Sequence, residues 1–362
     1  MIAAGASLAP TIAAAGFRHA PMGPALIGDV VARMPELAGL TGRERARATM
    51  RKVFAEVIAP AMADGITALA ESWRPDVIVN EDREFGSWVA AERLGIPYVT
   101  VQTTAWRTST IDITTEPLNA LRERYGLARD ERLAGLYRYL FLTTRPLSLR
   151  DPGVPYPEVT AELRPIADDW LAGDTPAVRE SFPPRDSRPR VAITLGTVNN
   201  SQHGILRAFV DGAVAAGAHI VVALGADPGT LGDVPPGVAV HAYVPMSTLL
   251  PEADVLAFHG GSGTMLAALA AGIPMVIVPI AADQPDNAEL CAAAGVASVI
   301  PLETIDAATA QAAIEAVLAD PSYRHRAREV ADEVATMPGP DAAFDRIESI
   351  ILAHTSIGGT SR

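Results

Sequence analysis

Residues 254–283 read DVLAFHGGSGTMLAALAAGIPMVIVPIAAD, and this stretch decides the fold. Between its two terminal aspartates it has no Asp, Glu, Lys or Arg, and it is long enough to cross a bilayer. Glycines and prolines, however, divide it into an apolar run, a glycine-rich turn, a helical run and a second apolar run. A buried strand–turn–helix–strand unit of a soluble protein therefore explains the pattern better than a membrane span.

The rest of the second half of the chain repeats this alternation of apolar and helical patterns. Short apolar runs lie at 190–196, 219–225 and 238–243, and residues 204–217 (GILRAFVDGAVAAG) have helical spacing. Several of the runs are apolar at consecutive positions, as expected for parallel strands that are covered on both faces. The pattern predicts a doubly wound, Rossmann-like domain.

The first half of the chain is less regular but contains a second strand–helix–strand unit. Its members are RPDVIVNED (74–82), FGSWVAAERLG (85–95) and IPYVTVQT (96–103). Residues 174–190 (DTPAVRESFPPRDSRPR) are rich in proline and charge, which is typical of a linker between domains. The sequence therefore predicts an α/β protein with two Rossmann-like domains, 1–180 and 187–362.

The composition argues against several classes of function. A formal net charge of −13 disfavours nucleic acid or an anionic membrane as a partner. The only cysteine, Cys291, rules out an internal disulfide and a multi-cysteine metal site, and its apolar helical surroundings indicate a small core residue. Because the chain has no basic segment followed by an apolar one at its start, we expect a cytoplasmic protein.

The hexapeptide HGGSGT (259–264) joins an apolar run to a helical run. The start of a helix offers unpaired N–H groups and the positive end of the helix dipole, and it therefore suits a phosphate. Gly261 and Gly263 would let a ligand approach the backbone, and Ser262, Thr264 and His259 can add hydrogen-bond donors. The alternative is that Ser262 or Thr264 is only an N-cap and that the glycines only form a turn.

The next apolar run leads directly into AADQPDNAEL (281–290). Asp283 and Gln284 therefore follow the neighbouring strand, at the same edge of the predicted sheet as His259. A carboxylate beside a carboxamide suits the hydroxyl groups of a sugar. The alternative is an N-cap for the following helix, supplied by Asp283 or Asp286, and the pair alone does not decide between them.

Residues 243–296 (YVPMSTLLPEADVLAFHGGSGTMLAALAAGIPMVIVPIAADQPDNAELCAAAGV) resemble the donor-binding signature of the family 1 glycosyltransferases, which have the GT-B fold. The resemblance is strongest to the bacterial branch that decorates macrolides and other natural products. It implies a TDP-sugar or UDP-sugar as donor and a lipophilic natural product as acceptor. It also implies that no metal or other cofactor is needed, because helix-terminus amides and His259 would stabilise the leaving diphosphate.

The resemblance further implies a role for each residue of the site. His259 would contact the donor diphosphate, and Asp283 and Gln284 would hold the sugar hydroxyls. Tyr243 would lie against the nucleobase, which the backbone of Val244 would also contact. The remaining residues expected at the diphosphate are Thr197, Gly261, Ser262, Gly263 and Thr264.

The first residues of the chain depart from the family pattern. Family members begin with a strand, a loop that carries the catalytic histidine, and a helix, whereas residues 1–20 (MIAAGASLAPTIAAAGFRHA) resemble the family's second strand and the segment after it. His19 lies past the catalytic position, so Glu81, or Asp82 beside it, is the candidate base; the alternative is that both are solvated acids at a strand end. A late start codon, a naturally short chain and a carboxylate in place of the histidine are three explanations. The first is favoured because an unfilled sheet edge is a liability.

The prediction is thus an inverting glycosyltransferase of antibiotic biosynthesis. Its first domain would bind the acceptor, its second domain would bind the donor, and the last helix would pack back on the first domain. A non-catalytic nucleotide-sugar-binding or accessory protein is the alternative that the missing histidine favours. A nucleotide-sugar epimerase of the same fold is a third, which Asp283, Gln284 and the YVPM segment disfavour. The sequence leaves the oligomeric state open, and a homodimer is compatible with it.

Overall fold

The computed structural model describes residues 1–24, 27–40, 42–166, 179–196, 202–225 and 231–358, which form two compact units. Unit 1 comprises Met1–Thr144, Pro152–Leu163 and Pro338–Arg362, and unit 2 comprises Arg145–Asp151 and Arg164–Met337. The chain thus first enters unit 2 at Arg145, returns to unit 1 at Pro152 and enters unit 2 again at Arg164, earlier than the boundary near residue 180 that the composition predicts. The last helix, α14 (Pro340–Gly358), belongs to unit 1.

Unit 2 contains a six-stranded sheet in which every neighbouring pair of strands is parallel. The strands are β7 (Arg190–Thr194), β8 (His219–Ala223), β9 (Val238–His241), β10 (Val255–Phe258), β11 (Met275–Ile277) and β12 (Ala297–Val299). Their order, β9-β8-β7-β10-β11-β12, is that of a doubly wound sheet with its switch point between β7 and β10. The predicted Rossmann-like second domain is confirmed.

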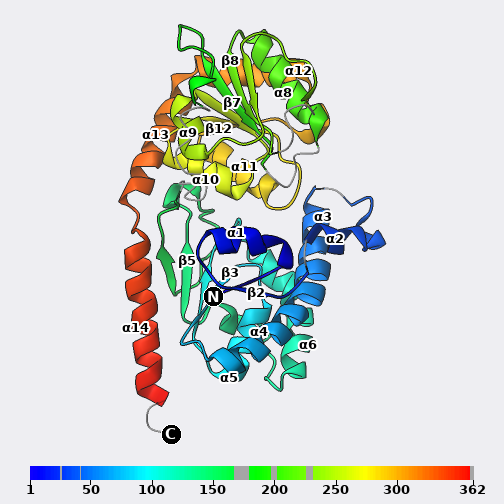
Figure 1. Ribbon diagram of the computed structural model, residues 1–362, viewed down its shortest axis with the longest axis vertical. Coiled ribbons are helices and arrows are strands. Elements are labelled where there is room, and N and C mark those ends of the chain that lie inside the picture. The colour runs from blue at the N-terminus through cyan, green and yellow to red at the C-terminus, as the bar shows by residue number, and fades with distance from the viewer. Residues whose placement is uncertain (25–26, 41, 167–178, 197–201, 226–230, 359–362) are drawn as a thin grey trace. The chain divides into compact units, whose positions relative to one another are not determined.

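Helices cover both faces of this sheet (Figure 1). Consecutive strand residues, such as Ala192 and Ile193 on β7, point to opposite faces and belong to separate buried apolar clusters. One cluster includes residues of α10 (Ser262–Ala270), α11 (Gln284–Ala293) and α13 (Pro321–Thr336), and the other includes residues of α8 (His203–Ala215) and α12 (Ala307–Ala319). Burial on both faces explains why these strands are apolar at consecutive positions.

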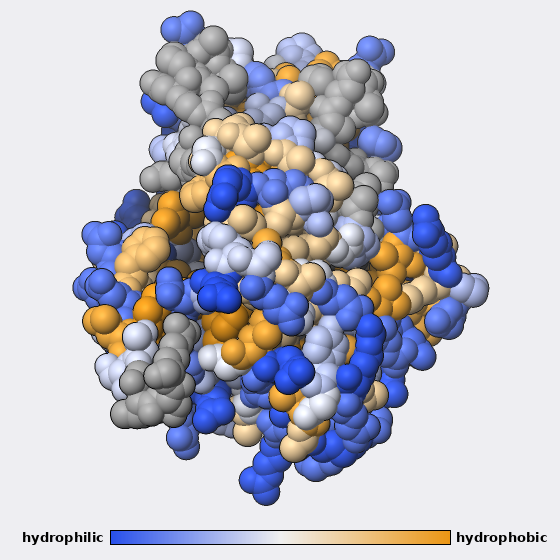
Figure 2. Space-filling model, turned by 60° about the horizontal axis from the view of Figure 1, so that its bottom comes forward, coloured by the Kyte–Doolittle hydropathy of each residue, from blue (hydrophilic) through white to orange (hydrophobic). Residues whose placement is uncertain are grey.

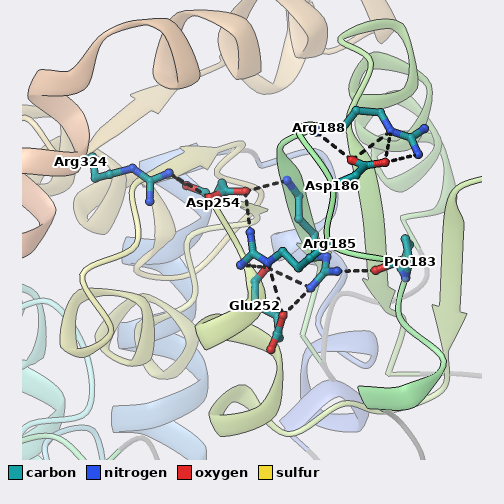
Figure 3. A network of polar contacts seen from close by, with 8 residues as sticks. Pro183, Arg185, Asp186, Arg188, Glu252, Asp254 and Arg324 are labelled. Atoms are coloured by element: carbon teal, nitrogen blue, oxygen red, sulfur yellow. Dashed lines mark hydrogen bonds and ion pairs between the residues drawn. The ribbon is translucent and has the colours of Figure 1, made fainter.

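Ion pairs hold the start of β7 and the residues before it against other parts of unit 2 (Figure 3). Arg185 donates to the carbonyl oxygen of Glu252 (3.0 Å) and pairs with Asp254 (3.3 Å), and Arg190 pairs with the Glu252 carboxylate (2.5 Å). Asp254 also accepts from the backbone N–H of Arg190 (2.9 Å) and pairs with Arg324 (3.3 Å). The end of the segment predicted as a linker is thus part of unit 2, because its arginines meet acidic residues just before β10.

Unit 1 contains two separate parallel sheets. β1 (Ile2–Ala4) pairs with β2 (His19–Pro21), whereas β3 (Ile78–Glu81), β4 (Tyr98–Val101), β5 (Leu140–Thr143) and β6 (Thr160–Glu162) form a sheet in that order. The helices before α14 are α1 (Ala9–Ala14), α2 (Ile27–Ala32), α3 (Gly42–Thr49), α4 (Ala59–Trp73), α5 (Gly86–Leu94) and α6 (Ser109–Arg124), and a π-helix, Met50–Ile58, joins α3 to α4. The predicted strand–helix–strand unit is confirmed as β3–α5–β4.

A cavity of about 430 Å³ in unit 1 is lined by residues of both β1 and β3. β3 is the edge strand of its sheet, and Val79 within it is 52% exposed, whereas its register partner on β4, Val99, is fully buried. β3 is therefore an edge strand with an exposed valine, and it lies beside the cavity.

One helical stretch, Gly42–Trp73, is long and apolar enough by length and composition to cross a membrane, and 44% of its apolar window is buried inside the protein. Most of its buried residues, among them Val53, Ala63 and Ile66, belong to the apolar clusters of unit 1, so packing within this unit accounts for much of its apolar character. On the face shown in Figure 2, hydrophobic surface forms patches separated by hydrophilic side chains.

Candidate functional site

The candidate donor site lies at the carboxyl ends of β7 and β10, which are adjacent in the sheet of unit 2. His259 directly follows β10, and Gly196 lies two residues after β7. Ligands of doubly wound sheets bind in the crevice at this switch point. The predicted site residue Thr197 also follows β7, but it lies outside the described residues.

The imidazole ring of His259 is held between two glycines. A Cβ atom at Gly196 would lie 3.0 Å from Cε1 of the ring, and a Cβ atom at Gly261 would lie 2.5 Å from Nε2. Both glycines therefore make room for the histidine. By contrast, a Cβ atom at Gly263 would meet no heavy atom within 4 Å, so no contact within the described protein requires a glycine there.

His259 is neutral in the folded protein at physiological pH. Burial lowers its pKa to about 4, although the Asp283 carboxylate and a hydrogen bond with the backbone of Thr194 act in the opposite direction. Its Nδ1 atom is buried and has no hydrogen-bond partner among the described residues. A buried polar atom without a partner is costly, so the protein holds the ring in this place at a cost in stability.

Helix α10 begins at Ser262 without a side-chain cap. Its N-cap residue is Gly261, so the interpretation in which Ser262 or Thr264 serves as the N-cap is wrong. The first N–H groups of the helix therefore have no capping acceptor from a side chain, and they carry the positive end of the helix dipole. Together with the neutral ring of His259, this helix end suits a diphosphate.

The side chain of Asp283 binds the start of α10. It occupies the N-cap position of α11 but makes no capping hydrogen bond to the backbone of that helix. Instead its Oδ2 accepts from the Ser262 hydroxyl (2.6 Å) and from Nδ2 of Asn287 (3.1 Å). The predicted neighbours Ser262 and Asp283 are thus in direct contact, although 21 positions separate them in the sequence.

Gln284 shapes the loop that precedes α11. Its Oε1 accepts from the backbone N–H groups of Ile280 (2.8 Å) and Ala281 (2.9 Å), and the residue is 4% exposed. Between these two residues and Gln284, Ala282 has a φ of +56°, a conformation that costs an alanine free energy. The loop is therefore held in one conformation, and the remaining hydrogen-bonding group of Gln284 is its Nε2 amide.

The predicted nucleobase contacts lie in the loop between β9 and α9 (Met246–Leu249), at the same edge of the sheet. Tyr243 is 49% exposed and is thus accessible to a ligand. Val244 is fully buried in the same apolar cluster as Phe258 and Met265, and this packing explains its side chain without a ligand.

The two candidate catalytic carboxylates lie at the end of β3 in unit 1. Asp82 accepts from the N–H (2.9 Å) and hydroxyl (2.7 Å) of Thr103 and from the hydroxyl of Thr104 (2.7 Å). Glu81 accepts from the backbone N–H of Arg83 (2.8 Å) and lines the cavity between β1 and β3.

Neither carboxylate is a solvated acid, since Asp82 is 7% exposed and Glu81 is half-buried. Burial first, and the Asp82 charge second, raise the pKa of Glu81 to about 7. Because a pKa near neutrality suits proton transfer and Asp82 is occupied by hydrogen bonds, Glu81 is the better candidate for the base. The other early candidate, His19, bonds the carbonyl oxygen of Ala4 (3.0 Å) within the β1–β2 sheet.

Within the ranges that the structure describes, no group of three or more His, Cys, Asp and Glu side chains could hold a metal ion. Cys291 is fully buried in the apolar cluster of unit 2, and burial raises the pKa of its thiol to about 12. It is a core residue, as the sequence predicts.

Comparison with known proteins places the chain in a family. Residues 207–350 match the family described as erythromycin biosynthesis protein CIII-like, C-terminal domain. The elloramycin glycosyltransferase of Streptomyces olivaceus is 33% identical over 299 residues, which cover 80% of this chain and 70% of that protein. The L-demethylnoviosyl transferase of Streptomyces niveus is 32% identical over 283 residues, which cover 75% of this chain and 70% of that protein.

The same relationship is found among solved structures. The spinosyn rhamnosyltransferase SpnG is 27% identical, has a TM-score of 0.79, and matches 96% of this chain and 91% of its own. A second structure of that protein contains thymidine diphosphate. The sequence resemblance is therefore confirmed: the chain is a glycosyltransferase of the GT-B fold and belongs to the bacterial natural-product branch of the family 1 glycosyltransferases.

Proposed function

We propose that this glycosyltransferase moves a sugar from a TDP-sugar, or less readily from a UDP-sugar, to a hydroxyl group of a lipophilic natural product, with inversion at the anomeric carbon. The observation that carries the proposal is the uncapped start of α10 beside the buried, neutral ring of His259. The thymidine diphosphate in the SpnG structure supports TDP as the nucleotide.

In this proposal the donor is held by groups with distinct tasks. The N–H groups at the start of α10, with Gly263 and Thr264, bind the diphosphate, and His259 donates a hydrogen bond to it from its neutral ring. Asp283 and Gln284 bind the sugar hydroxyls, while Tyr243 stacks on the base, Val244 lies beside it and Thr197 reaches the phosphates. Because charge on the leaving diphosphate is stabilised by amides and imidazole, no metal is needed.

Transfer itself is a single displacement. The acceptor hydroxyl loses its proton to the Glu81 carboxylate while its oxygen attacks the anomeric carbon. The bond from that carbon to the diphosphate breaks, and the nucleoside diphosphate leaves with the bonding electron pair. Attack opposite the leaving group inverts the anomeric centre, and the near-neutral pKa of Glu81 supports its role as the base. The net charge of −13 supports small-molecule partners rather than nucleic acid.

The first test is calorimetric titration of the full chain with TDP and UDP. His259→Ala should weaken TDP binding by about 1–3 kcal/mol, the cost of a lost hydrogen bond to a charged group. His325→Ala is the matched control, because its side chain is 73% exposed on α13, and it should bind like the wild type. A folded wild-type chain that binds neither nucleotide would overturn the proposal.

A second test addresses the base. Glu81→Gln should bind TDP normally but lose transfer and donor hydrolysis by roughly 10²–10⁴-fold, the usual share of a general base. A wild type that binds TDP yet neither transfers nor hydrolyses sugar would instead support a nucleotide-sugar-binding role. Release of an epimerised sugar without an acceptor would support the epimerase.

A further inference from the structure

A buried arginine lies behind the candidate donor site and has no part in the function proposed above. Arg145 belongs to the short segment Arg145–Asp151 of unit 2, and it is 1% exposed. Its Nη2 donates to the hydroxyl oxygen of Ser262 (2.8 Å) and to Oδ1 of Asn287 (2.7 Å). The guanidinium thus contacts the first residue of α10 and the first turn of α11.

Asn287 closes the network between the two donor loops. It is fully buried, and its Nδ2 lies within hydrogen-bonding distance of the carbonyl oxygen of Gly260 (2.8 Å), the hydroxyl oxygen of Ser262 (3.1 Å) and Oδ2 of Asp283 (3.1 Å). Arg145 is charged and buried, so this network is worth more than a surface contact and is costly to leave half-satisfied.

The chemistry of the four side chains fixes the direction of the hydrogen bonds. A guanidinium can only donate, so Arg145 occupies a lone pair of the Ser262 hydroxyl and directs its proton toward Asp283. Among the described residues, the hydrogen bonds made to the Asp283 carboxylate go to Oδ2. Its Oδ1 is the oxygen that this arrangement leaves for a sugar hydroxyl.

The network also balances charge. A nucleoside diphosphate at the start of α10 would bring negative charge close to the Asp283 carboxylate, which is 8% exposed. Two such anions repel each other strongly in a poorly solvated site. The Arg145 guanidinium lies one hydroxyl group away from that carboxylate and offsets its charge.

We propose that Arg145 is a positioning residue of the donor site: through Ser262 and Asn287 it orients the Asp283 carboxylate toward the sugar and makes the site electrostatically acceptable to a diphosphate. The inference rests on the proposed function, because it assumes that this helix end binds the donor. It predicts that loss of the guanidinium weakens the charged nucleotide far more than the uncharged nucleoside.

The test compares TDP and thymidine binding to the full chain by calorimetry and ligand-observed NMR. Arg145→Met should weaken TDP by about tenfold to a hundredfold, the range for hydrogen bonds to charged groups, and leave thymidine within about twofold. Arg145→Lys should give an intermediate loss of TDP affinity, because lysine keeps the charge but not the guanidinium geometry that bonds both Ser262 and Asn287. Arg207→Met, an exposed arginine of α8, is the matched control and should bind both ligands like the wild type.

A rescue experiment separates positioning from general damage. In an Asp283→Asn background the carboxylate charge is gone, so adding Arg145→Met should then cost TDP binding no more than about threefold. A TDP affinity for folded Arg145→Met within about twofold of the wild type, or an equal loss with and without the Asp283 carboxylate, would overturn the inference while leaving the proposed function intact.

Should Arg145→Met not fold, Ser262→Ala removes the hydroxyl that links Arg145 to Asp283 at a small cost in volume. It should weaken a TDP-sugar more than TDP, and equal effects on the two would overturn the inference. A folded wild type that binds no TDP would overturn the proposed function itself.

Discussion

A methyl group at Gly261 tests whether the donor site depends on the place of the His259 ring. The added Cβ atom would lie 2.5 Å from Nε2, and an ordinary contact needs at least 3.4 Å, so ring or backbone must move by roughly 0.9 Å. Gly261 has a φ of −64°, which alanine adopts freely, so backbone strain adds nothing. Overpacking of this kind lowers the free energy of unfolding by about 1–3 kcal/mol. Alanine also lowers the conformational entropy of the unfolded chain, which offsets about 0.4–1 kcal/mol of this loss.

Gly261→Ala should therefore lower the melting temperature by a few degrees, since about 1 kcal/mol corresponds to 2–4 °C in a domain of this size. It should also weaken TDP binding by at least about tenfold, because the displaced ring loses its hydrogen bond to the diphosphate. Gly263→Ala is the matched control, since nothing lies within 4 Å of its added methyl group. As a control for stability, it should raise the free energy of unfolding by up to about 1 kcal/mol, because alanine is a better helix former than glycine. It should still weaken TDP binding, because in the proposed function the diphosphate approaches Gly263. A Gly261→Ala variant with wild-type melting temperature and TDP affinity would refute the reasoning.

Three further predictions concern pH and packing. The pKa of His259 is about 6.5 in the unfolded chain and about 4 in the folded protein. As the pH falls from 6.5 to 4, the unfolded chain therefore binds a proton that the folded protein does not bind, and the free energy of unfolding should fall by up to about 3 kcal/mol. In urea titrations His259→Gln should reduce this fall in the free energy of unfolding. An equally large fall in the variant would contradict the reasoning that burial lowers the pKa of His259. Glu81 keeps its proton up to about pH 7 when folded but only to 4.5 when unfolded, so its favourable contribution is present below 4.5 and is lost as the pH rises through 7. Glu81→Gln should accordingly stabilise the protein above pH 7 and change little below pH 4.5 in the same titrations. Val79→Thr should change the free energy of unfolding by less than about 0.5 kcal/mol, whereas Val99→Thr, at its buried register partner, should lower it by about 1–3 kcal/mol. Equal melting temperatures of the two variants would show that Val79 on β3 is covered.

The fold of unit 2 could be predicted because its strands are buried on both faces. Such strands need apolar residues at consecutive positions, and the glycines that end them are visible in the sequence. In unit 1, β1 and β2 have three residues each, too few for a period to show, and a π-helix interrupts the long helix that ends at Trp73.

The end of the predicted linker could not be assigned to unit 2 from the sequence, for a different reason. Arg185 and Arg190 read as solvated charges of a linker, because their acidic partners lie more than 60 residues later, around the start of β10. Only the fold brings these charges together.

The donor site divides in the same way between local and distant signals. His259 and its glycines, and Asp283 with Gln284, could be found because each group follows a strand and opens a helix within a few residues. Arg145 could not, since it lies 117 positions before Ser262 and 142 before Asn287. A lone arginine after a strand carries no signal of burial, and arginines are usually solvated.

The three glycines of HGGSGT turn out to have three separate causes. Gly260 has a φ of +88°, and a Cβ atom there would lie 3.0 Å from Ile277, so the turn itself requires it. Gly261 is required because the His259 ring occupies the space that a side chain at position 261 would fill. Gly263 has an ordinary helical place and open space around it, so neither the turn nor the packing of the described residues accounts for it. The proposed function supplies a cause, because a donor diphosphate bound at this uncapped helix start would approach the backbone of Gly263 from outside.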